Sequence, residues 1–200
     1  MQGLARCIEM AHQFGCPTVR IMSGLREITI RGLTGAEHWL VKNDPWSRLA
    51  PLVEPAVRLA EREGVTLVIE TAMSGMIFSA WTARKLLDEI GSDNLKVLWD
   101  PANCLHSQEP AWPDGYESIR GGRIGHVHIK DISLVSPQGL TAFSRLGTAQ
   151  MAQYLQPIAD ALRAENYSGV VSYESVHRPE GGSFEDGFKS GIDLFKRLFG

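Results

Sequence analysis

Short apolar runs alternate with longer amphipathic stretches along this chain. Five runs have the length and the β-branched content of buried strands, and they cover residues 18–22, 65–70, 96–100, 124–128 and 169–174. Around them apolar positions recur at helical spacing, which predicts helices over residues 2–14, 46–62, 77–90, 116–120, 149–165 and 184–198. We expect the longest loops at 25–45, with one helical turn around 36–41, and at 133–147.

This alternation predicts an α/β fold with a parallel sheet. Four of the strands end at Glu70, Asp100, His128 and Glu174. The first three ends are about thirty residues apart, the length of one βα unit with its crossover helix. No low-complexity linker divides the chain, so we expect a single domain over residues 1–200. Five strands fit either an open α/β sheet or the last five units of an eight-stranded barrel, and the pattern alone favours neither.

Composition and charge narrow the class of protein. Hydrophobic residues make up 44% of the chain and charged residues 22%, as in ordinary globular domains. The net charge of −3 comes without a basic stripe, which argues against a nucleic-acid surface. No apolar run is long enough for a membrane span. Three cysteines without paired spacing favour a reducing compartment, and with no secretory pattern we expect a cytoplasmic protein.

The four strand-end residues are metal-compatible side chains. Glu70, Asp100, His128 and Glu174 offer three carboxylates and one imidazole, a mixture that suits Mn²⁺, Mg²⁺ or Co²⁺ and fits Zn²⁺ less well. Because the carboxyl ends of parallel strands meet at one edge of the sheet, we expect the four to converge. Any one of them alone would more often cap a helix or bind a loop.

The same residues stand in a pattern that resembles a known family. It consists of Glu70, the run Trp99-Asp100-Pro101-Ala102-Asn103, the run from Gly125 through His126-Val127-His128 to Asp131, and Tyr173-Glu174. This pattern is similar to the xylose isomerase-like barrel superfamily, and within it to the sugar phosphate isomerases and epimerases. Residues 11–20 also resemble the third helix and fourth strand of that family.

The resemblance implies a partial (β/α)₈ barrel, in which strands four to eight are present and the first three units are missing. It also implies one divalent metal ion held by Glu70, Asp100, His128 and Glu174. A chain of this kind is either truncated or completes its barrel with another chain, so a homo-oligomer is one expectation.

The chemistry of such a site is proton transfer next to a carbonyl. A divalent cation polarises the carbonyl oxygen and stabilises an ene-diolate, while two carboxylates remove and return a proton. We assign these two roles to Glu70 and Glu174, and expect a sugar or polyol isomerase or epimerase with a small-molecule substrate. Candidate substrate-binding residues are Asn103, His106, Lys130, Arg145 and Arg20. Lys130 and Asp131 are equally well explained by a salt-bridged loop.

Three other functions remain open at this point. A dehydratase of the inosose type would use the same base, with hydroxide leaving from the carbon beta to the carbonyl. Endonuclease IV-type enzymes share the superfamily, but they need more His and Asp ligands than this chain supplies. An incomplete barrel could also bind a metal or a partner without catalysing a reaction.

Overall fold

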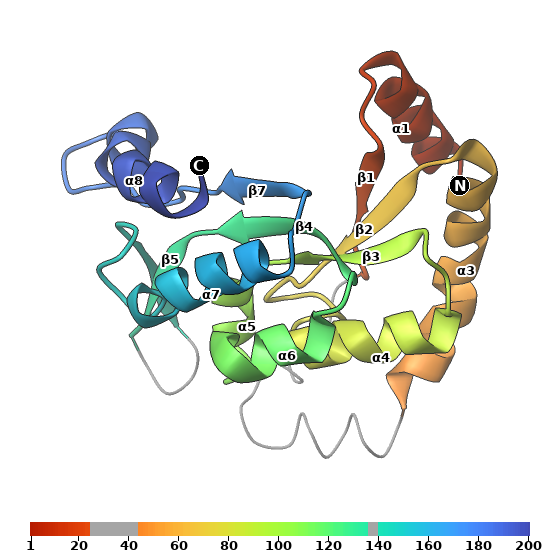
Figure 1. The fold of residues 1–200 in the computed structure, drawn as a ribbon, viewed down its shortest axis with the longest axis horizontal. Coiled ribbons are helices and arrows are strands. Elements are labelled where there is room, and N and C mark those ends of the chain that lie inside the picture. The colour runs from red at the N-terminus through yellow and green to blue at the C-terminus, as the bar shows by residue number, and fades with distance from the viewer. Residues whose placement is uncertain (25–43, 136–139) are drawn as a thin grey trace.

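Five parallel strands form the centre of the molecule. The computed structural model describes residues 1–24, 44–135 and 140–200, so the helical turn expected around 36–41 lies outside it. The strands pair in the order β1–β2–β3–β4–β7 (Figure 1). Their bounds are Thr18–Ile21, Thr66–Glu70, Leu95–Trp99, Ile124–Ile129 and Val170–Tyr173. Each neighbouring pair is parallel, which confirms the predicted α/β fold with a parallel sheet.

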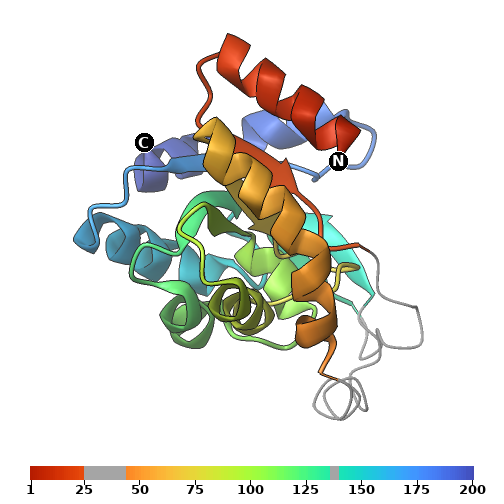
Figure 2. The same ribbon diagram turned by 90° about the vertical axis from the view of Figure 1, so that its right-hand side faces the viewer.

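Helices connect the strands and agree closely with the predicted ranges. They are α1 (Gln2–Gln13), α3 (Pro45–Glu63), α4 (Ala80–Ile90), α6 (Tyr116–Ile119), α7 (Ala152–Ala164) and α8 (Phe184–Phe199). Helices α3 and α4 end at Gly64 and Gly91, which both adopt φ of 65°. Figures 1 and 2 show α3, α4 and α6 along one side of the sheet. Among the described helices, none combines the length and the apolar character needed to cross a membrane.

Strand alternation separates the hydrophobic core from the functional face. Leu67, Ile69, Val97, Trp99 and Val127 are fully buried in the core beneath the helices. Successive side chains of a strand point to opposite faces, so the residues between these belong to the other face of the sheet. Glu70 and His128 occupy this second face, each at or near the end of its strand. The sequence therefore aims both side chains away from the helices and toward the inside of the half-barrel.

Regular structure also occurs in two stretches for which the sequence predicts no helix or strand. The stretch 133–147 was expected to be a loop, but strands β5 (Asp131–Leu134) and β6 (Thr141–Ser144) pair there as an antiparallel hairpin. The Ser133 and Ser144 hydroxyls share a 2.8 Å hydrogen bond across it. The loop after Asp100 contains the short helix α5 (Pro101–Leu105) and a helical turn over Ala111–Gly115. These elements are too short for hydrophobic periodicity to reveal.

Helix α8 lies close to the strand that precedes Glu174. Gly191 of α8 faces the Tyr173 hydroxyl, and a Cβ atom at this position would clash with it. The Tyr173 ring also stacks on Phe195 of the same helix at 5.4 Å between centroids. This packing fixes the end of β7, from which Glu174 projects.

Candidate metal centre

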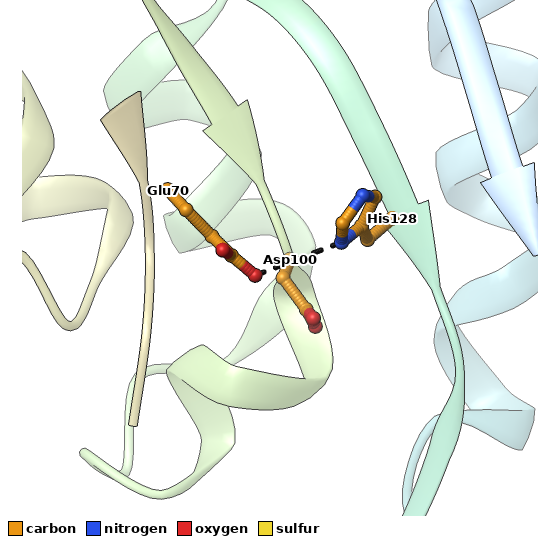
Figure 3. Close-up of side chains that lie close together, drawn as sticks. All are labelled: Glu70, Asp100 and His128. Carbon is orange, nitrogen blue, oxygen red and sulfur yellow. Dashed lines mark ion pairs between the residues drawn. The ribbon is translucent and has the colours of Figure 1, made fainter. Parts of the chain in front are cut away.

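Three strand ends bring Glu70, Asp100 and His128 together. Glu70 is the last residue of β2, Asp100 directly follows β3, and His128 lies near the end of β4. One ligand atom from each of the three residues lies within 4.8 Å of the other two. In Figure 3 the Glu70 carboxylate and the His128 ring face each other across the end of β3, where Asp100 is located. The three residues thus have the convergence that a shared cation requires.

The Nδ1 atom of His128 lies between two carboxylates. It is 3.6 Å from Oε1 of Glu70 and 3.7 Å from Oε2 of Glu174, too far for a good hydrogen bond to either. The atom is buried and has no hydrogen-bond partner within the described residues. Buried polar atoms are rarely left without a partner, and a ring nitrogen that faces two carboxylates at such distances suits metal ligation. The donor set and this unpaired nitrogen therefore fit a divalent cation.

Glu174 stands apart from the other three candidate ligands. Its side chain is 37% exposed, and it does not belong to the group whose ligand atoms are all within 4.8 Å. Its Oε2 atom reaches toward His128 and accepts a hydrogen bond from Lys130 at 2.7 Å. The sequence pattern treats the four ligands as equivalent, whereas the structure gives Glu174 the most open position.

Asp100 is fixed by Thr71, which directly follows β2, and by Asn103 on α5. Its side chain caps α5, because Oδ1 accepts a 3.0 Å hydrogen bond from the Asn103 amide. Its backbone N–H donates to the Thr71 hydroxyl at 2.9 Å. Complete burial raises the pKa of Asp100 to about 6, although the Lys130 ammonium and the Asn103 amide both act to lower it. Sequence reasoning did not identify Thr71, a buried polar residue directly after Glu70.

Lys130 joins Asp100 to Glu174. Its Nζ atom donates to Oδ2 of Asp100 at 2.6 Å and to Oε2 of Glu174 at 2.7 Å, and its side chain is only 7% exposed. Burial opposes the charged ammonium, but the Asp100 and Glu174 carboxylates raise the pKa of Lys130 overall. Burial likewise opposes the charged Glu174 carboxylate, and its bond to Lys130 lowers the pKa of Glu174 overall. The lysine that we predicted to bind substrate thus lies inside the ligand cluster.

The other predicted substrate-binding residues fall into two groups. Arg20 forms an ion pair with Oε2 of Glu70 while its side chain stays half exposed. Asn103 is buried, and its Nδ2 donates to the Thr71 carbonyl at 2.9 Å. His106 instead contacts Thr141 of β6 through Nε2 at 3.1 Å. Arg145 is exposed just after β6. Arg20 and Asn103 therefore adjoin the candidate ligands, whereas His106 and Arg145 belong to the hairpin region.

Backbone N–H groups surround the Asp131 carboxylate. Its carboxylate accepts hydrogen bonds from five backbone N–H groups, at 2.9–3.1 Å, which belong to Ile132, Gly147, Thr148, Ala149 and Met151. The side chain is buried. These bonds hold the segment between β6 and α7 against the end of β4. The sequence suggests a salt-bridged loop around Asp131, and the structure anchors this loop through backbone N–H donors instead.

Comparisons with known proteins agree with this arrangement. The profile of one protein family, Xylose isomerase-like TIM barrel, matches residues 1–198. No curated protein sequence matches the chain.

Solved structures share the fold at low sequence identity. A probable 3-DHS dehydratase, AsbF, from Bacillus anthracis matches with a TM-score of 0.72 and 16% identity, over 98% of this chain and 69% of its own. An L-ribulose 3-epimerase matches with a TM-score of 0.70 and 19% identity, over 99% and 66%. The IOLI protein with a bound zinc atom matches with a TM-score of 0.66 and 17% identity, over 99% and 68%. The chain therefore spans about two thirds of the length of these structures.

Proposed function

We propose that this chain, which belongs to the xylose isomerase-like TIM barrel family, is a divalent-metal-dependent isomerase or epimerase of sugars or polyols. The observation that carries the proposal is the unpaired Nδ1 atom of His128, which faces Glu70 and Glu174 at 3.6 and 3.7 Å. Glu70, Asp100, His128 and Glu174 would hold the cation. An epimerase and a zinc-bound protein among the structures of the same fold support this choice.

Glu70 and Glu174 are suited to move protons on opposite sides of a substrate. They approach the His128 ring nitrogen from β2 and from the end of β7, on either side of β4 and β3 in the sheet. Each carboxylate is paired with a cation, Arg20 for Glu70 and Lys130 for Glu174. One carboxylate would take the proton from the carbon next to the carbonyl, and the other would return a proton to the opposite face. A positioned group of this kind accelerates a reaction by about 10²–10⁴-fold.

The role of the cation follows from the weakness of the carbon acid. When bound, a divalent cation polarises the substrate carbonyl and stabilises the negative charge that develops on its oxygen. Arg20 and Asn103 adjoin the ligands and would contact substrate hydroxyl groups. Solvent isotope exchange tests this chemistry directly: with Mn²⁺ in D₂O, we expect deuterium to enter ketopentoses or ketohexoses at the carbon next to the carbonyl. Proton NMR measures it, and a chelator should stop it. Exchange that continues after complete metal removal would contradict the proposal.

Metal binding should also stabilise the fold. A ligand that binds only the folded protein raises the free energy of unfolding by about 2.7 kcal/mol at one hundred times its Kd. For a chain of this size we expect the melting temperature to rise by about 5–10 °C. Differential scanning fluorimetry with Mn²⁺, Mg²⁺, Co²⁺ and Zn²⁺ against a chelated sample measures the shift and ranks the ions. A His128→Asn variant should lose most of it, and an equal shift in that variant would argue against His128 as a ligand.

A dehydratase is the second candidate function, favoured by the structural similarity to AsbF. The same carboxylate would remove the proton, and hydroxide would then leave from the carbon beta to the carbonyl. The product is an unsaturated ketone with a new ultraviolet absorption band. Absorbance during incubation with an inosose, compared with isotope exchange on a simple ketose, separates the two reactions.

The proposed activity also needs a complete wall around the site. In the part of the chain that the structure describes, the sheet ends at β1 and β7, whereas a barrel of this type has eight strands. We infer that three further parallel strands, or a second copy of the chain, border these edges in the active form. Light scattering after size exclusion should then show a dimer. If it shows a monomer, that monomer should be inactive in the isotope-exchange assay. A monomer of the isolated chain with full activity would remove this requirement.

A further inference from the structure

Lys130 occupies a position that conflicts with a bound metal ion. Its ammonium group lies 2.6 Å from Asp100 and 2.7 Å from Glu174, two of the four candidate ligands. Both oxygens of Asp100 already accept hydrogen bonds, one from the Asn103 amide and one from Lys130. A cation that binds Asp100 must therefore share or displace one of these donors. Because the lysine is almost fully buried, water screens its charge only weakly.

We propose that Lys130 is the internal counter-ion of the metal-free site, and that it competes with the divalent cation for Asp100 and Glu174. This inference rests on the proposed metal site. It assigns to Lys130 a positioning role, since it acts through the two carboxylates. Without metal, the single charge of the ammonium offsets part of the charge of two carboxylates that it joins. With metal, the same ammonium weakens the binding of the incoming cation.

The charges around the site support this assignment. Three carboxylates, those of Glu70, Asp100 and Glu174, share two cationic partners, Arg20 and Lys130. Among the described residues, Arg20 forms its ion pair with Glu70 alone, and it is half exposed, so solvent can take over its role. Lys130 bridges a fully buried carboxylate and a partly exposed one. Removal of one partner from such a buried pair leaves an uncompensated charge, which is strongly destabilising.

The competition predicts effects of opposite sign on stability and on metal affinity. A Lys130→Met variant should melt at a lower temperature than the wild type when both are chelated. The same variant should bind Mn²⁺ about tenfold or more tightly, because the ammonium no longer competes for Asp100 and Glu174. Competition between two cations for shared ligands is reciprocal, so removing one cation favours the other. Its rise in melting temperature on metal addition should consequently exceed that of the wild type. A lysine that only held the ligands in place would give the reverse, with weaker metal binding in the variant.

Isothermal titration calorimetry with Mn²⁺ and scanning fluorimetry of the chelated and loaded proteins test this directly. Lys96→Met is the matched control, because this substitution removes the same charge from the neighbouring strand β3. Lys96 lies four residues before Asp100, about 13 Å away at the ~3.3 Å rise of a strand residue. This control should leave the Kd for Mn²⁺ within twofold of the wild type.

Each outcome decides the matter. Tighter Mn²⁺ binding with lower stability of the chelated Lys130→Met protein supports the inference, as does a variant that folds only when Mn²⁺ is added. Equal or weaker binding overturns it while the wild-type titration still upholds the metal site. A wild type that binds none of the four ions removes the proposed function, and the inference with it. Lys130→Gln, which keeps a hydrogen-bond donor without the charge, is judged by the same Kd comparison if Lys130→Met does not fold under either condition.

Discussion

Replacing Glu174 by glutamine should lower turnover by about 10³-fold or more while leaving the fold intact. The amide keeps the shape of the side chain, but it can neither take up a proton nor offer a charged oxygen to a cation. Loss of one acid–base group costs about 10²–10⁴-fold. Because the side chain is 37% exposed, the substitution should shift the melting temperature of the chelated protein only slightly.

The measurement is the rate of solvent deuterium incorporation into the ketose, at saturating Mn²⁺ so that metal affinity does not limit the rate. Glu180→Gln serves as the control, since Glu180 is exposed in the loop that follows Glu174. The control should exchange at the wild-type rate. If Glu174→Gln retained more than a tenth of that rate, Glu174 would not be one of the two proton-transfer groups.

Local sequence patterns predict the scaffold well in this chain. The helix expected over 46–62 is observed as Pro45–Glu63, because a long apolar repeat precedes a glycine that ends the helix. The strand expected to end at Glu70 does so. Both features depend on residues that are adjacent in the sequence, and hydrophobic periodicity reports such features directly. The likeness to the xylose isomerase-like family, inferred from the strand-end motifs, is confirmed over residues 1–198.

Contacts between distant residues are what the sequence does not predict. Lys130 follows a strand as an ordinary charged residue would, yet its partners are 30 and 44 residues away in the sequence. No local pattern distinguishes this ion pair from contact with a substrate. The β5–β6 hairpin was missed for a related reason. Each of its strands has only four residues, and each depends on pairing with the other rather than on its own hydrophobic pattern. The metal-binding and catalytic roles of the strand-end residues stay predictions.

Asp131 is a further example of contacts between distant residues. It stands beside Lys130 in the sequence, and most of its hydrogen-bond donors are far along the chain. Four of its five backbone donors are 16 to 20 residues away, in the segment that enters α7. Oδ2 alone accepts from Gly147, Thr148 and Ala149. A buried carboxylate is well matched to this cluster, because each of the five N–H groups donates a hydrogen bond to it. Lys130 thus directly precedes a residue that is anchored on all sides, and we expect this anchor to help hold Lys130 in place.

We accordingly expect Asp131→Asn to destabilise the protein by about 3 kcal/mol or more, since each buried donor left without a partner costs about 1–3 kcal/mol. The amide group would point its own hydrogens at some of these N–H groups. Urea unfolding should show a lower midpoint at an unchanged m-value. Asp160→Asn is the matched control, because Asp160 is exposed on α7 and its contacts with Gln156 and Arg163 stay on the surface of the same helix. This control should change the free energy of unfolding by less than about 0.5 kcal/mol. If the two variants unfolded at the same midpoint, the Asp131 anchor would contribute nothing to stability, and another interaction would have to hold Lys130 between Asp100 and Glu174.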